Sequence, residues 1–175
     1  MTQLHQIQLA YVPVEDRALL RISTTDQSEF RFWITRRYAK LLWPALTRSL
    51  LQSTHVATQT EPDAKSAVLA FQHEAAMADS DFKTQFQAEK LQTPLGVEPT
   101  VLARIQCLRQ DDNQTLLAMH PLQGQGIELQ LNDLLLHSLV KLLKDAVQAG
   151  QWELELELAP QPAEDLQRTQ SRSRH

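Results

Sequence analysis

Residues 28–50 read SEFRFWITRRYAKLLWPALTRSL, and a change of period within them decides the fold. Phe30, Phe32 and Ile34 occupy alternate positions, which predicts a strand with one buried face. From Thr35 onward the apolar residues recur every three or four positions, as on one face of a helix. The Thr35 hydroxyl is suited to accept a hydrogen bond from an unpaired helix amide. The stretch therefore predicts a strand that leads directly into a capped helix.

Two further strands are predicted before this stretch. Gln3–Val12 alternates imperfectly, Arg17–Thr24 alternates more clearly, and short polar turns join them to the third strand. Adjacent strands with short connections form an antiparallel meander. Pro44 lies inside the following helix and predicts a kink there. The buried side of that helix is predicted to carry Tyr38, Leu41, Leu42, Ala45, Leu46 and Ser49.

The same pattern recurs in the second half of the chain. When Arg17–Leu50 is moved forward by 97 positions it lies on Gln114–Val147 without a gap, and the change of period coincides. Asn132 then stands where Thr35 stands, as the cap of a second helix that ends near Gly150. Repetition at a fixed spacing indicates a duplicated supersecondary unit. Two unrelated amphipathic patterns that match by coincidence are the alternative.

Other segments have no counterpart in this repeat. A long amphipathic central helix is predicted at about Asp63–Lys90, ended by the proline-rich stretch that follows. Strict alternation over Trp152–Leu158 predicts a strand with one wet face, and residues 159–175 resemble an unstructured tail in composition. The predicted units are residues 1–52, 53–99 (connector and central helix), 100–158 and 159–175.

These elements predict an α+β fold of two antiparallel sheets, each carrying a helix, with the central helix packed beside them. Because three-stranded units bury little apolar surface, the two units are expected to share one core and to unfold together. In element order the chain resembles the Whirly and PC4-like group of single-stranded DNA-binding proteins. The resemblance covers Leu4–Leu50 and Val101–Leu158 and implies packing about a pseudo-twofold axis. The lysine-rich Whirly signature does not occur in the sequence.

Composition points to an ordinary soluble protein. The apolar share is 42%, the charged share is 22%, and no apolar run approaches the ~20 residues of a membrane span. A lone cysteine, Cys107, and an N-terminus without a signal-like layout favour a cytoplasmic location. The net charge of −4 is uneven: residues 1–52 carry +3 and the remainder −7. Such polarity suits an anionic partner or head-to-tail self-association.

The sequence contains no spacing typical of a metal, nucleotide or catalytic site. Neither CxxC nor HExxH occurs, and only four glycines are present, none in a phosphate-loop pattern. His137 is expected to be a core-edge histidine with one backbone hydrogen bond. The acidic row Glu153, Glu155 and Glu157 is expected to be the wet face of a strand. We therefore expect no cofactor, no metal and no enzymatic activity.

One group of residues is unusual and is named here the basic–aromatic surface. Two arginines at a helix N-terminus oppose the helix dipole, which suggests an anion site or a partner site. Exposed aromatics beside cations also suit base stacking. The structural alternative places the tryptophans at an interface and pairs the arginines with acidic residues. The surface comprises Arg31, Trp33, Arg36, Arg37, Lys40 and Trp43.

The expected function is that of a non-catalytic binding or assembly protein whose partner is another protein or a second copy of the chain. Absent catalytic signatures, polarised charge and amphipathic tryptophans motivate this expectation. The alternative is single-stranded nucleic-acid binding through the basic–aromatic surface.

Overall fold

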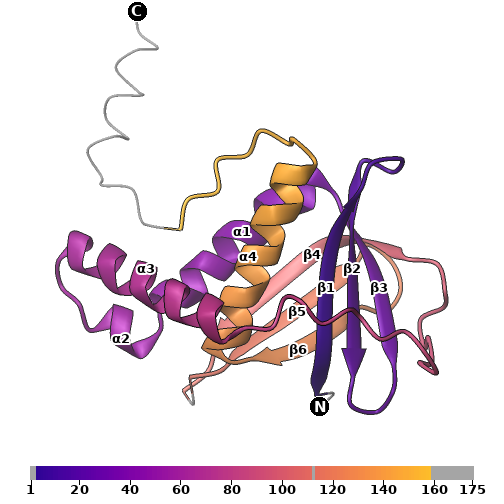
Figure 1. Ribbon diagram of the computed structural model, residues 1–175, viewed down its shortest axis with the longest axis horizontal. Coiled ribbons are helices and arrows are strands. Elements are labelled where there is room, and N and C mark those ends of the chain that lie inside the picture. Colours follow the sequence, from indigo (N-terminus) through magenta and orange to yellow (C-terminus); the bar gives the residue numbers. More distant parts are fainter. Residues whose placement is uncertain (1–2, 112, 159–175) are drawn as a thin grey trace, which may run out of the picture.

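The computed structural model describes residues 3–111 and 113–158, and it is an α+β fold of one sheet and four helices (Figure 1). The predicted tail at 159–175 lies outside the described residues. The elements in chain order are β1 (Leu4–Val12), β2 (Arg17–Thr24), β3 (Glu29–Ile34), α1 (Arg36–Leu51), α2 (Thr54–Ala57), α3 (Pro62–Asp79), β4 (Thr100–Arg109), β5 (Thr115–Pro121), β6 (Ile127–Leu131) and α4 (Asp133–Ala149).

The described strands form a single six-stranded mixed sheet in the order β1-β2-β3-β4-β5-β6. Each set of three is an antiparallel meander, as predicted. The expectation of two separate sheets is wrong, because β3 and β4 join the meanders by a parallel pairing. That joint is short: Phe32 pairs with Thr100 and Trp33 with Val101.

The two meanders use matching registers. Leu20 pairs with Phe32 in the first, and Leu117 pairs with Leu129 in the second, 97 positions later. The ladder is irregular between Leu4 and Gln6 in β1, and again between Leu102 and Arg104 in β4. Both predicted helix caps are confirmed: the Thr35 side chain accepts from the Tyr38 amide at 3.1 Å, and that of Asn132 accepts from the Leu135 amide at 2.9 Å.

The helices do not each cover their own meander. α1 packs against β4 and α4 packs against β1, while α1 and α4 lie against each other (Figure 1). The buried apolar residues of both halves form one cluster, which includes Phe32 and Leu42 from the first half and Leu129 and Leu139 from the second. Each half therefore supplies a helix to the other half's first strand.

The central helix is shorter than its pattern predicts. α3 ends at Asp79, and Ser80 donates its hydroxyl to the Ala76 carbonyl at 2.7 Å. Asp81 accepts from the backbone amides of Lys83 and Thr84, a local hydrogen bonding that competes with helix continuation. Residues 80–99, named here the strap, then pass across β1, β2 and β3 before β4 begins (Figure 1).

The predicted strand at the C-terminal end of the described chain is also a correction. Residues 152–158 have no strand partner among the described residues, although exposed and half-buried side chains do alternate along them. Leu154, Leu156 and Leu158 pack against the core cluster. The alternation is thus produced by packing on the helix layer rather than by a ladder. None of the helices in the described residues has both the length and the apolarity of a membrane crossing.

Candidate functional site

The basic–aromatic surface is divided by the fold. Arg36, Arg37 and Lys40 are exposed at the start of α1. Trp33 is half-buried on β3, with the Arg17 guanidinium 5.8 Å from its ring centroid. Trp43 is only 7% exposed, so it offers no open face for stacking.

The burial of Trp43 has a long-range cause. Its indole Nε1 donates to the Glu157 carbonyl at 3.2 Å, which ties α1 to the C-terminal described segment. Trp152 is also buried, and it donates to an Asp16 carboxylate oxygen at 3.2 Å. Trp43 and Trp152 therefore act as structural anchors. For Trp43 this agrees with the structural alternative rather than with a stacking surface.

Arg31 is held by an ion-paired cluster rather than left free for a ligand. The buried Glu29 carboxylate accepts from Arg31 Nε at 2.9 Å and from Arg21 Nε at 2.8 Å. Arg31 also donates to the Val97 carbonyl of the strap at 3.2 Å. Burial raises the pKa of Glu29, but the hydrogen bonds from Arg31 and Arg21 outweigh it and hold that pKa below its usual value.

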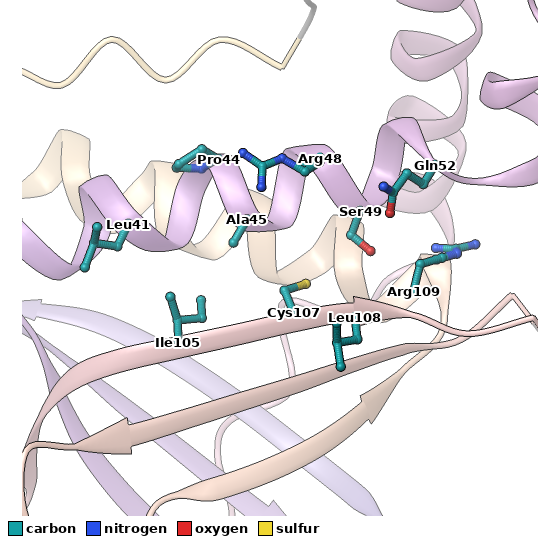
Figure 2. A pocket seen from close by; sticks show the side chains of 10 residues that line it. All are labelled: Leu41, Pro44, Ala45, Arg48, Ser49, Gln52, Ile105, Cys107, Leu108 and Arg109. Carbon is teal, nitrogen blue, oxygen red and sulfur yellow. The ribbon is translucent and has the colours of Figure 1, made fainter.

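A cavity of about 520 Å³ lies between α1 and β4 and is named here the α1–β4 groove (Figure 2). Leu41 and Ala45 of α1 face Ile105 and Cys107 of β4 across it. Its remaining wall residues are Pro44, Arg48, Ser49, Gln52, Leu108 and Arg109.

The groove follows an open strand edge. Since β4 pairs with β3 only at Thr100 and Val101, the rest of that edge has no partner strand among the described residues. The Arg104 carbonyl accepts instead from the Tyr38 hydroxyl of α1, at 3.1 Å. Backbone groups alternate between the two edges of a strand, so Gln106 and Leu108 also direct their amides and carbonyls to this edge.

The walls combine apolar side chains with cations. Leu41 of α1 is 46% exposed, whereas Leu108, which is 49% exposed, points away from α1 on the other face of β4 (Figure 2). Arg109 pairs with Asp133 at 2.6 Å, whereas Arg48 has no ion pair within the described residues. No acidic residue lines the groove among those residues. The groove is therefore apolar along its length and cationic at one end.

Cys107 lies inside this groove. Burial raises the pKa of its thiol, and a hydrogen bond with Ser49 and the charges of Arg109 and Arg48 offset that rise only in part. A thiol with a raised pKa is a poor nucleophile at neutral pH. Cys107 is thus part of the wall rather than a reactive centre.

A second cavity, of about 660 Å³, lies between α4 and β1 and is named here the α4–β1 groove. The first part of the strap, residues 80–86, forms part of its lining. Ser80 Oγ and Ser138 Oγ are hydrogen-bonded at 2.8 Å, and Lys141 Nζ lies 5.2 Å from the Phe82 ring centroid. On the strand side, Gln6 Oε1 accepts from the Gln87 amide at 3.0 Å.

Two histidines meet between α3 and α4. His73 Nδ1 and His137 Nδ1 are hydrogen-bonded at 3.1 Å, so His137 bonds a side chain and not the expected backbone group. Burial, reinforced by the neighbouring His73, lowers the pKa of His137 to about 4. Burial also lowers the pKa of His73. Both rings are therefore neutral at physiological pH, and within the described residues no three metal-ligating side chains gather.

The sequence reasoning missed the α1–β4 groove. The only signal was Leu108, an apolar residue on the side of β4 that should be wet. Leu41 was predicted to be buried, and its exposure follows from the open edge beneath it. Comparisons with protein-family models, with curated proteins and with solved structures found no match to this chain.

Proposed function

We propose that this chain is a non-catalytic binding protein and that a segment of another protein lies in the α1–β4 groove. The observation that carries the proposal is the unpaired edge of β4 beside a groove with half-exposed apolar walls. Extended peptides bind to free sheet edges through main-chain hydrogen bonds, and side-chain pockets then give specificity. Gln106 and Leu108 supply such main-chain groups, and Leu41 supplies apolar contact area.

We also propose that the two halves are copies of one unit, a meander followed by a helix. The matching registers of Leu20–Phe32 and Leu117–Leu129 support this, and so do the two helix caps at equivalent positions. The likeness to the Whirly group stays a prediction. In a duplicated protein, the two grooves beside α1 and α4 are equivalent sites that have diverged.

Single-stranded nucleic-acid binding has less support. Arg36, Arg37 and Lys40 remain exposed, but Trp43 is buried and Arg31 is ion-paired. Phosphate contacts alone would give weak binding that falls steeply with salt. A fluorescent single-stranded oligonucleotide titrated at low salt tests this alternative.

The proposed function is tested by selecting peptides from a displayed random library on the full chain. Leu41→Gln removes apolar contact in the groove, and Leu108→Gln removes it on the other face of the open β4 edge, where an added strand would also make contact. Both positions are half-exposed, so the fold should tolerate both changes. Phe71→Gln is the matched control, because Phe71 is 72% exposed on α3 and lies outside the groove. Selected peptides should bind the groove variants at least about tenfold more weakly and the control unchanged. Failure to select any peptide, or equal loss in all three variants, would refute the proposal.

Self-association is the other form of the proposal. A second copy in the groove predicts a solution mass above that of the 20.0 kDa chain, and Leu41→Gln should lower it. Light scattering on the wild type and on this variant separates a partner protein from a second copy.

A further inference from the structure

We infer that the α1–β4 groove binds an extended, acidic segment of a partner protein, in the way that the α4–β1 groove holds the strap of this same chain. The inference rests on the proposed function and adds the conformation and the charge of the ligand. It is carried by the equivalence of the two grooves, one of which has a non-helical segment of the chain along its wall.

The grooves are built from equivalent positions. Ile105 of β4 lines the first, and Ile7, 98 positions earlier in β1, lines the second. On the helix side, Ala45 lines the first and Leu142, 97 positions later in α4, lines the second. The offset of 97 also relates the strand registers and the helix caps, and the offset of 98 relates the ladder irregularities of β1 and β4. The two cavities are therefore the same site in two copies of one arrangement.

The strap shows how such a groove holds a chain segment. Residues 80–87 have no helix or strand assignment, and they run between α4 and β1. Phe82 contacts Lys141, and Phe86 lies under the Arg21 guanidinium, 4.2 Å from the ring centroid. The Gln6 side-chain amide holds the strap backbone at Gln85 and Gln87. The groove is thus lined by a non-helical segment that turns at Asp81 and continues past Gln6 of β1, with spaced aromatic residues and a held backbone.

The charge of the helix wall differs between the grooves. α4 carries Lys141 and Asp145, which pair with each other at a distance of 2.5 Å. The equivalent positions of α1 carry Pro44 and Arg48, so the pair is replaced by one cation without an ion pair in the described residues. Arg48 therefore favours an acidic ligand by charge complementarity, while Arg109 of β4 at the same end is already paired with Asp133.

The two grooves also differ at the helix position that contacts Ser80 of the strap. Ser138, which binds Ser80 of the strap, is replaced by the half-exposed Leu41. An apolar residue of the ligand is therefore expected where the strap has Ser80. The ligand chemistry that results is an extended segment with aromatic or aliphatic residues and with carboxylates near Arg48.

Synthetic peptides based on the strap test the inference. The acidic probe is residues 79–88 with Ser80→Leu and Lys83→Glu, and the basic probe is the same segment with Ser80→Leu, Asp79→Lys and Asp81→Lys. Binding is measured by fluorescence anisotropy with the full chain at two salt concentrations. Because Cys107 is the only cysteine and lines the groove, its alkylation rate at one fixed alkaline pH reports whether the groove is filled.

The acidic probe should bind at least about tenfold more tightly than the basic probe, weaken with salt, and slow the alkylation of Cys107. Arg48→Glu should remove the preference for the acidic probe. Arg37→Glu, an exposed arginine of α1 outside the groove, should leave it unchanged. Equal binding of both probes, or no protection of Cys107, would overturn the inference.

Two other occupants would be visible in the same experiment. Faster alkylation of Cys107 after removal of residues 159–175, without any probe, would identify the chain's own C-terminal segment as the occupant. Alkylation that slows as protein concentration rises would identify a second copy. Either result overturns the partner assignment. If library peptides need Leu41 and Leu108 but carry no acidic residues, the proposed function stands and this inference fails.

Discussion

At the scale of single residues, the contact between His73 and His137 gives the chain a dependence on pH. Each ring is partly or fully withdrawn from water, and their Nδ1 atoms share one hydrogen bond. Such a bond between two neutral rings needs one ring protonated at Nδ1 as the donor and the other protonated at Nε2 as the acceptor, and protonation of the acceptor at its Nδ1 removes the bond. Lys141 and Lys144 add repulsion to a charged His73, and Glu74 opposes them weakly.

Folding stability should fall as pH drops from about 6.5 toward 4, because the unfolded chain binds the proton that folded His137 refuses. The loss attributable to His137 is up to about 3 kcal/mol at the low end of that window. Denaturant melts at several pH values measure it. His137→Gln should flatten the dependence, whereas His55→Gln, at an exposed position on α2, should keep it. A pH profile that His137→Gln leaves unchanged would exclude this account.

Local residue roles were predictable from sequence, and long-range ones were not. The caps at Thr35 and Asn132 follow from neighbours within four positions, and both were predicted correctly. Trp43 was included in the basic–aromatic surface because helical spacing groups it with Lys40, and the sequence left its exposure open. Its actual partner, the Glu157 carbonyl, is 114 positions away, and periodicity carries no information about such a contact.

At the scale of elements, the strap is held by few side chains, so its anchors can be tested singly. Phe86→Ala removes a half-buried ring that lies under Arg21 and should lower unfolding free energy by about 1–2 kcal/mol. Phe71→Ala, at a mostly exposed ring, should change it by less than about 0.5 kcal/mol. Chemical denaturation compares the two variants. Equal effects would mean that the contact of Phe86 with Arg21 adds nothing to stability.

The start of α1 offers a test with a predicted gain. Arg36→Glu combined with Arg37→Glu places acidic residues at the positive end of the helix dipole, so stability should hold or rise by up to about 1 kcal/mol. Arg48→Glu in the last turn is the control of opposite sign and should cost roughly 0.3–1 kcal/mol. Thermal melts distinguish the two. A clear loss in the double variant would show that these arginines serve internal pairing.

Element types were easier to predict than element ends. The three strands and the helix of each half match their periodic patterns, because burial of one face determines both the type of an element and the spacing of its apolar residues. The spacing of Phe82 and Phe86 continued the α3 pattern, yet Ser80 and Asp81 end that helix through their own hydrogen bonds. The alternation over residues 152–158 reflects side chains that pack against the core. It does not show a β-ladder, because a ladder needs a neighbouring strand and the pattern of one segment says nothing about its neighbours.

At the scale of the whole molecule, the crossed packing of helices makes the halves interdependent. α1 belongs to the first half in sequence but packs against β4 of the second. A fragment of residues 1–60 therefore lacks the surface that covers its own helix. We predict that this fragment is unfolded by circular dichroism and that the full chain melts in one transition. A soluble, folded fragment would contradict the shared core.

The repeat in the sequence predicted the strands and the helix of each half but not how the two halves join. One sheet forms instead of two because β3 and β4 pair in parallel over only Phe32–Thr100 and Trp33–Val101. A joint of this length leaves no periodic signal. The same short joint leaves most of the β4 edge open, so the feature that sequence reasoning missed is the one that creates the α1–β4 groove.

Amide hydrogen exchange of the full chain, with and without a library-selected peptide, tests the binding groove most directly. Exchange should slow at residues 104–108, where Gln106 and Leu108 direct their amides to the open edge of β4, and along the facing side of α1. Arg36, Arg37 and the α4–β1 groove should be unaffected. Slowing confined to the start of α1 or to β1, with β4 unchanged, would contradict the proposed function.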